Sequence, residues 1–461
     1  MEKVVNWIND IVWSPALVVL LVAAGLYFTV RSRFVQVRKL GTMIRLLLPK
    51  KEKTGKGVSS FEAFCIALSG RVGTGNIVGV ATAIALGGPG AVFWMWVIAF
   101  LGAATAFTES TLAKIYCYEH RGKLRGGPFA YISKGLRSPV LAAAFAIATI
   151  IASGMLLTTV QANGMAMALN NSFGISKLWG GLLLATLIAL VVFGGMHRIS
   201  KVAAIITPFM AILYILVAIT VLTVNREQIP SMFALIFSSA FGAGPICGGM
   251  MGSAIMLGAK RGLFSNEAGQ GSGAIPSASA VVSHPVEQGL AQAFSVYVDT
   301  LLVCTATALM ILSAGTYNVF DPATGEMLYA GAPQLGSNYA AFTQNAVDSV
   351  IPGFGSIFVG VSLCFFVFTT VMAYYFNAES SITYLFQSRS EKSEKVAVTA
   401  LRLVMICAIV FGAVKEAGLV WTLGDIGIGL MAWINVISIL ILSPKVFNSL
   451  KDFENRKRHG C

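Results

Sequence analysis

The feature that most constrains this chain is a series of apolar runs, each about as long as a bilayer is thick, separated by short polar segments. A helix needs about twenty predominantly apolar residues to cross a membrane. The sequence contains eleven such candidates, and no polar interval long enough for a soluble domain. The longest interval, 316–348, reads as a loop. The candidate spans are 11–31, 60–86, 91–115, 139–168, 178–195, 202–224, 243–281, 288–313, 352–386, 396–413 and 418–442.

The composition supports an all-α integral membrane protein. Of 461 residues, 56% are hydrophobic and only 11% are charged, whereas soluble domains average about 25% charged residues. A lipid-facing surface needs almost no charge, but a water-facing one does. The net charge of +13 does not indicate a nucleic-acid partner, because the basic residues lie in short loops without interleaved aromatic residues.

The distribution of Lys and Arg predicts the orientation, because cytoplasmic loops are enriched in them. If the segment after the first run is cytoplasmic, the outside segments hold four basic residues and the N-terminus lies outside. An odd number of spans then leaves the C-terminus in the cytoplasm. The inside segments hold nine basic residues in 31–57, six in 114–137, two in 198–201, four in 389–402 and five in 445–458.

Two of the candidate spans contain glycine-rich polar interruptions, at 69–76 and at 262–273. The interrupted spans are five apart and run in opposite directions, which is the signature of an inverted-repeat transporter. We therefore expect one membrane domain, 1–461, built as a 5+5 inverted repeat with one extra N-terminal helix and two broken helices. Its parts are an extra helix and linker at 11–57, repeats at 58–225 and 230–445, and a cytoplasmic tail at 446–461.

The interruptions are where chemistry is expected. Glycine costs about 1 kcal/mol relative to alanine in a helix interior, and unwound backbone at membrane depth must be buried in protein or line a cavity. A break frees N–H groups that suit a carboxylate and carbonyl oxygens that suit a cation. The alternative is that the small residues only permit close helix packing. Because Thr, Asn and Arg accompany the glycines of the first interruption, we favour a site at 73–76, and we favour one in the same way at 266–269.

Other polar residues inside the apolar runs leave two interpretations open. Glu109, Gln161 and Asp299 could each serve a ligand, a cation or a proton, or simply join helices by hydrogen bonds. Arg71 and Glu267, one in each interruption, could form a gate or a structural ion pair.

The sequence does not indicate an enzyme, a resident metal site or a cofactor. The seven cysteines show no CxxC spacing, and no HExxH motif occurs. The Gly73-Thr74-Gly75 stretch follows a membrane helix and not the strand that a dinucleotide site requires.

Five stretches together carry a resemblance to the alanine or glycine:cation symporter family. They are 69–83 (SGRVGTGNIVGVATA), 126–128 (GGP), 262–269 (GLFSNEAG), 299–308 (DT followed by CTATA) and 368–370 (FTT).

The resemblance implies an Na⁺- or H⁺-coupled importer of a small neutral amino acid, in the cell inner (plasma) membrane, with the fold shared by the neurotransmitter:sodium symporters. It implies two sets of residues. The substrate set is Thr74, Gly75, Gln161, Phe264, Asn266, Gly269 and Gln270. The cation set is Ser69, Val72, Asn76, Thr369 and Thr370.

Two positions depart from the family pattern. The family usually has Met where this chain has Gln270, and Trp where it has Tyr374. A more polar site would admit glutamine or serine besides alanine and glycine. The remaining alternative is an amino-acid-gated channel or a sensor on the same scaffold, although two unequal breaks do not resemble a channel filter.

Overall fold

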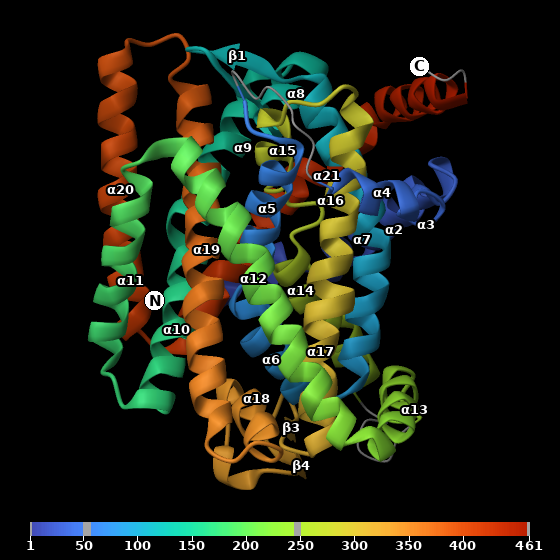
Figure 1. Ribbon diagram of the computed structural model, residues 1–461, viewed down its shortest axis with the longest axis vertical. Coiled ribbons are helices and arrows are strands. Elements are labelled where there is room, and N and C mark those ends of the chain that lie inside the picture. The colour runs from blue at the N-terminus through green and yellow to red at the C-terminus, as the bar shows by residue number, and fades with distance from the viewer. Residues whose placement is uncertain (1, 49–56, 244–249, 459–461) are drawn as a thin grey trace.

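The structure is a computed structural model that describes residues 2–48, 57–243 and 250–458 (Figure 1). In these residues the chain is predominantly helical, with two antiparallel hairpins. Cys247, Cys461 and four of the nine basic residues counted at 31–57 (Lys50, Lys51, Lys53 and Lys56) lie outside the described residues. The uninterrupted long helices are α2 (Pro15–Arg31), α7 (Gly90–Ile115), α11 (Lys177–Val192), α12 (Gly195–Val224), α19 (Phe354–Leu385), α20 (Glu391–Val414) and α21 (Ala417–Arg458).

Four further segments are helices with a break or a π-helical turn. They are α5 (Ser60–Arg71) with η1 (Gly75–Gly79) and α6 (Val80–Gly87); α9 (Pro139–Ile151) with η2 (Ala152–Leu156) and α10 (Leu157–Phe173); α14 (Met251–Asn266) with α15 (Ala274–Ser279); and α16 (Pro285–Val296) with η4 (Tyr297–Cys304) and α17 (Thr305–Ala314). The shorter elements are α1 (Glu2–Val12), α3 (Val35–Arg38), α4 (Leu40–Leu46), β1 (Tyr118–His120), β2 (Lys123–Arg125), α8 (Pro128–Gly135), η3 (Arg226–Gln228), α13 (Ile229–Ala240), β3 (Asn318–Phe320), β4 (Met327–Ala330), η5 (Pro333–Leu335) and α18 (Tyr339–Asp348).

In the part of the chain that the structure describes, eight helices are long and apolar enough to cross a membrane, and a ninth results if the bent α5–α6 pair is one span. α11 is apolar but has only 16 residues. The long predicted run at 243–281 divides into α14 and α15, and 244–249 lie outside the described residues. The long run at 352–386 is one continuous helix of 32 residues.

The interval 316–348 is folded, so the prediction of a loop was wrong. It contains the β3–β4 hairpin, η5 and α18, whose Ala340, Phe342 and Val347 are buried. Seven of the ten residues of this helix are buried, Thr343 and Gln344 among them, so it is enclosed by the protein on more than one side. No one-sided apolar pattern therefore marks it in the sequence. Figure 1 shows these elements at one end of the molecule, and β1 with α8 at the other.

Small residues bring the helices around the breaks into close contact. A side chain on Gly258 of α14 would lie 2.5 Å from Trp94 Cβ and 2.6 Å from the Ala91 carbonyl oxygen of α7. A side chain on Gly289 of α16 would likewise collide with Thr111 of α7, and one on Gly412 of α20 would collide with the Thr159 backbone of α10. Thus α7 packs closely against α14 and α16, and α10 packs closely against α20. The broken segments lie buried in the bundle.

The N-terminal helices are docked onto α21. The Trp13 indole Nε1 donates a hydrogen bond to the Asp425 carbonyl oxygen over 2.8 Å, and Trp433 Nε1 donates to the Val12 carbonyl oxygen over 3.0 Å. Two indole rings therefore anchor the corner between α1 and α2. Each ring packs in the protein and pairs its N–H group with a backbone carbonyl oxygen.

Candidate functional site

The first break separates α5 from η1. Val72 leaves the helical conformation at φ −78° and ψ 92°, and the two helical parts meet at an angle of 49°. Gly73 follows it, where a Cβ would lie 2.7 Å from both Gln161 Oε1 and Thr370 Oγ1. Glycine is required here because the break is packed against α10 and α19.

The freed donors of the first break are directed at one side chain. The Thr74 backbone N–H and its hydroxyl both donate to Gln161 Oε1, over 3.0 and 3.1 Å. Gly73 N–H donates to Asn76 Oδ1 over 2.8 Å. Two convergent donors at the start of a helix form the arrangement that a carboxylate oxygen accepts.

The second break is a loop of left-handed residues between α14 and α15. Glu267 has φ 55°, and Gly269 and Gly271 have φ 96° and 83°. Side chains rarely adopt this conformation, which explains the glycines. Asn266 Oδ1 accepts the Ala268 N–H over 3.0 Å.

Glu109 of α7 holds the second break in place. Its Oε2 accepts the N–H groups of Gly269 and Gly271, each over 3.2 Å, and Asn435 Nδ2 of α21 over 2.9 Å. Asn435 Nδ2 also donates to the Gly269 carbonyl oxygen, and the Tyr131 hydroxyl donates to Asn435 Oδ1. Of the two interpretations of Glu109, these contacts favour the structural one. Asn435 and Tyr131 were not predicted, because nothing marks them in the sequence.

Arg71 connects the two breaks. Its Nε donates to the Asn266 carbonyl oxygen over 2.6 Å, and its Nη1 donates to Gln292 Oε1 and Ser295 Oγ of α16. These three hydrogen bonds of Arg71 thus go to neutral acceptors, while the Ser272 hydroxyl donates to the Glu267 carboxylate over 2.6 Å.

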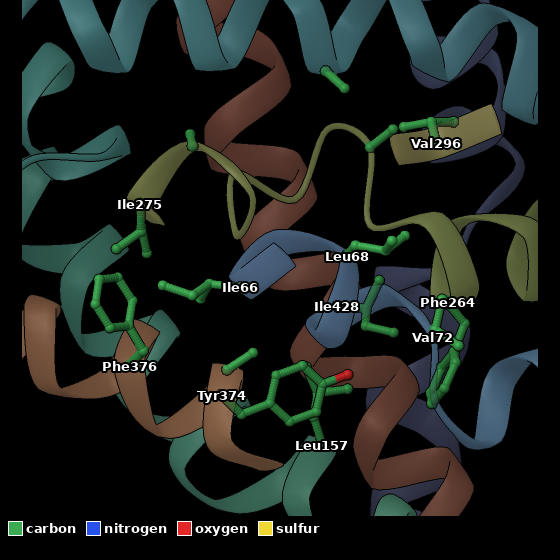
Figure 2. Close-up of a cluster of buried hydrophobic side chains, with 14 of the residues drawn as sticks. Ile66, Leu68, Val72, Leu157, Phe264, Ile275, Val296, Tyr374, Phe376 and Ile428 are labelled. Atoms are coloured by element: carbon green, nitrogen blue, oxygen red, sulfur yellow. The ribbon is translucent and has the colours of Figure 1, made fainter. Parts of the chain in front are cut away.

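Aromatic side chains enclose the first break. Phe264 of α14 packs against Gly75, where a Cβ would lie 3.0 Å from Phe264 Cδ1. Figure 2 shows Tyr374 and Phe264 among the buried side chains near Val72. The Tyr374 hydroxyl interacts with Gln161 and Glu267, so it joins the two breaks from α19.

Three oxygens of the predicted cation set lie together. The Thr370 hydroxyl of α19 is 2.9 Å from the Ser69 carbonyl oxygen and 3.1 Å from that of Val72. It is also 2.7 Å from the Phe366 carbonyl oxygen of its own helix. One hydroxyl has one proton to donate, so the cluster holds more acceptors than protons. Such an oxygen-rich break is suited to a small cation.

The two other predicted cation residues lie elsewhere. The Thr369 hydroxyl contacts Met210 Sδ of α12 and carbonyl oxygens of its own helix. Asn76 Nδ2 donates to Asp299 Oδ1 over 2.6 Å. Asp299 Oδ2 accepts the hydroxyls of Ser265 and Thr300, over 2.9 and 2.7 Å. Asp299 is therefore a fully buried carboxylate that accepts hydrogen bonds from the neutral side chains of Asn76, Ser265 and Thr300.

Gln270 points back toward the helix that precedes it. Its Nε2 donates to the Leu263 carbonyl oxygen over 2.8 Å, and its Oε1 has no hydrogen-bond partner among the described residues. The structure thus gathers Thr74, Gly75, Gln161 and Phe264 at the first break. Asn266, Gly269 and Gln270 are part of the second.

An ion pair lines a neighbouring cavity of about 400 Å³, which Val78 of η1 also lines. Arg261 Nη2 is 2.6 Å from Asp425 Oδ2, and both residues line the cavity with Trp421. The Arg261 guanidinium lies 4.8 Å from the Trp421 ring centroid and 5.5 Å from that of Phe264. Arg261 thus lines the cavity and packs on Phe264, which lies against Gly75 of the first break, a role that the sequence analysis did not assign to Arg261.

Comparison with known proteins gives one consistent result. The pattern of the sodium:alanine symporter family matches residues 1–461. The chain is 48% identical over 418 residues to the "Sodium/proton-dependent alanine carrier protein" of Bacillus sp. (strain PS3), covering 91% of this chain and 93% of that one. It is 42% identical over 461 residues to the "Probable sodium/glutamine symporter GlnT" of Bacillus subtilis (strain 168), covering 100% and 93%.

Among solved structures, the crystal structure of MhsT in complex with L-phenylalanine has a TM-score of 0.54 at 15% identity, covering 86% of this chain and 99% of that one. This similarity concerns the fold alone.

Proposed function

This chain belongs to the sodium:alanine symporter family, and we propose on that premise that it is a secondary active symporter that imports a small neutral amino acid with Na⁺. The observation that carries the proposal is the first break. The Thr74 donors suited to a carboxylate and the oxygens of Ser69, Val72 and Thr370 suited to a cation belong to one unwound segment.

The architecture proposed for this function has eleven spans. The eight long helices, the α5–α6 pair, the short α11 and the α14–α15 pair together give that number. The proposed boundaries remain 11–57 for the extra helix and linker, 58–225 and 230–445 for the repeats, and 446–461 for the tail. The basic loops support an N-terminus outside and a C-terminus in the cytoplasm of a cell-membrane protein.

The proposed binding step is a replacement at Thr74. Gln161 Oε1 occupies the position that a substrate carboxylate oxygen would take, accepting both Thr74 donors. The amino acid displaces it, and Na⁺ binds among the oxygens of Ser69, Val72 and Thr370. Because both ligands order residues 69–76, each stabilises the segment that the other needs, which is a physical basis for coupling.

The proposed substrates are alanine, glycine, glutamine and serine. Alanine and glutamine appear in the names of the two relatives. Phe264 and Tyr374 limit the size of the side chain, and the unpartnered Gln270 Oε1 offers an acceptor to a polar one. Asn76 and the adjacent Asp299 carboxylate form a candidate site for binding a further cation or a proton.

Transport in proteoliposomes tests the proposal. A radiolabelled amino-acid panel is measured with Na⁺ and pH gradients imposed separately. We expect uptake of a small neutral amino acid that collapses when Na⁺ is replaced or its gradient dissipated. Uptake unaffected by both treatments would contradict Na⁺ coupling. Binding without counterflow would instead support a sensor.

Gln161→Glu is expected to raise the KM for the amino acid by about tenfold or more. A resident carboxylate beside the Thr74 donors accepts stronger hydrogen bonds than an amide oxygen and competes with the substrate. Initial rates in proteoliposomes over a range of substrate concentrations measure this. Thr159→Val, which alters a hydroxyl bonded to its own helix, is the control. An unchanged KM in Gln161→Glu would refute the proposed replacement.

A further inference from the structure

Another cavity, of about 560 Å³ and lined mainly by polar and charged residues, lies where the β1–β2 hairpin meets α19 and α20. Figure 1 shows β1 at the same end of the molecule as the turn between α19 and α20. None of the residues that line this cavity belongs to either helix break. The cavity is therefore not part of the proposed transport site.

The lining of this cavity is rich in positive charge. Five Lys or Arg side chains face three carboxylates, so the basic groups are in excess by two. The basic residues are Arg121, Lys123, Arg125, Lys395 and Arg402, and the acidic residues are Glu379, Glu391 and Glu394.

All three carboxylates already have cationic partners. Glu394 Oε2 is 3.1 Å from Arg121 Nη2 and 3.1 Å from His120 Nε2. Glu391 Oε1 is 2.6 Å from Lys395 Nζ. Arg125 Nη2 is 3.3 Å from Glu379 Oε1, and its Nη1 donates to the Ser380 hydroxyl over 2.9 Å.

Lys123 and Arg402 supply the excess charge. No described carboxylate lies within ion-pair distance of either side chain. Arg402 Nε donates to the Tyr375 hydroxyl over 3.0 Å, and its guanidinium lies 4.9 Å from the Phe193 ring centroid. The guanidinium is thus held in place by neutral groups, and an anion in the cavity would compensate its charge.

An apolar groove of about 710 Å³ continues from this cavity along the outer face of α20. The two spaces share Glu391, Lys395 and Thr399. All seven lining residues belong to α20. Lys392 joins the three shared residues, and beyond them lie Ala400, Val396, which is 63% exposed, and Leu403, which is 60% exposed. Such residues on a membrane helix face lipid. The positive cavity therefore opens onto a surface that suits an acyl chain.

We propose that the cavity and groove together form a binding site for one anionic phospholipid. The phosphate lies against Lys123 and Arg402, and an acyl chain follows Val396 and Leu403. Basic pockets between membrane helices at the interface bind anionic headgroups. A free phosphate ion would use the cavity but would leave the adjoining groove unexplained. The bound lipid would join the β1–β2 hairpin to α20.

Lipid titration of the delipidated full-length protein in detergent tests this site. Native mass spectrometry and thermal melting are measured with phosphatidylglycerol, with phosphatidylcholine and with soluble glycerol phosphate. We expect phosphatidylglycerol to bind about tenfold more tightly than phosphatidylcholine and to raise the melting temperature. Glycerol phosphate, which has no acyl chain, should not reproduce the shift.

The Lys123→Gln/Arg402→Gln double variant should lose most of the preference for phosphatidylglycerol. Lys123→Gln alone, on a hairpin near the turn, should lose part of it without disturbing the contacts of Arg402. Lys415→Gln, at the opposite end of α20, is the matched control and should retain it. Three outcomes would each overturn the proposal. The first is equal binding of the two lipids, and the second is an unchanged preference in both the single and the double variant. The third is a rise in melting temperature with glycerol phosphate as large as that with phosphatidylglycerol.

Discussion

Thr370→Val is expected to raise the Na⁺ concentration for half-maximal uptake by about tenfold or more. The substitution keeps the shape of the side chain but removes the hydroxyl between the carbonyl oxygens of Ser69 and Val72. A lost hydrogen bond or polar contact to a charged group costs about 1.5–3 kcal/mol, and 1.4 kcal/mol is about a factor of ten in binding. Uptake at saturating amino acid over a series of Na⁺ concentrations measures the change.

Thr369→Val provides a control within the same turn of helix. Its hydroxyl contacts Met210 and carbonyl oxygens of α19, away from the first break. We expect its Na⁺ dependence to remain within about twofold of the original, since the hydroxyl bonds mainly within its own helix. If both variants shift equally, or if only Thr369→Val shifts, the cation does not bind where we propose.

Glu109→Ala is expected to abolish measurable uptake and to lower the melting temperature. The change leaves the Gly269 and Gly271 N–H groups and the Asn435 amide without their shared acceptor in a fully buried site. Each unsatisfied buried donor costs about 1–3 kcal/mol. The second break should then lose its conformation, with uptake per correctly inserted molecule falling by about a hundredfold or more.

Two variants separate this effect from general damage to α7. Thr108→Val removes a hydroxyl that donates to the Ala104 carbonyl oxygen of its own helix, so uptake should be nearly unchanged. Glu109→Gln keeps one acceptor oxygen and should retain part of the uptake. Full activity of Glu109→Ala would show that the hydrogen bonds to the second break are dispensable.

Both breaks could be predicted because several residues that disfavour a continuous helix occur together there. Within otherwise apolar runs, glycines cluster with Arg, Thr and Asn at 69–76, and with Ser, Asn, Glu and Gln at 262–273. Such clusters destabilise a continuous helix whatever surrounds them. The structure accordingly ends α5 at Arg71 and α14 at Asn266. The fold of 316–348 was missed because its helix and hairpin are short and because polar residues such as Thr343 and Gln344 are buried together with the apolar ones.

The pairing of residues across the bundle could not be predicted in the same way. Glu109 lies far along the chain from Gly269 and Asn435, and many polar residues could have been its partners. Thr369 and Thr370 are neighbours in sequence, but successive residues of a helix point about 100° apart. Only one of the two can therefore face the first break, and the sequence contains no signal that selects it.

The sequence by itself determined that this chain is a helical membrane protein of the sodium:alanine symporter family and where its helices break. The membrane helices and their breaks follow from local composition, since lipid selects apolar runs and clustered glycine and polar residues interrupt them. The family follows instead from the resemblance of five separate stretches of the sequence. Only the tertiary structure decided that Gln161 accepts the hydrogen bonds of Thr74 and that the Thr370 hydroxyl contacts the carbonyl oxygens of Ser69 and Val72. It also decided that Glu109 accepts the N–H groups of the second break. These contacts join separate helices, and close packing of small residues sets which faces meet.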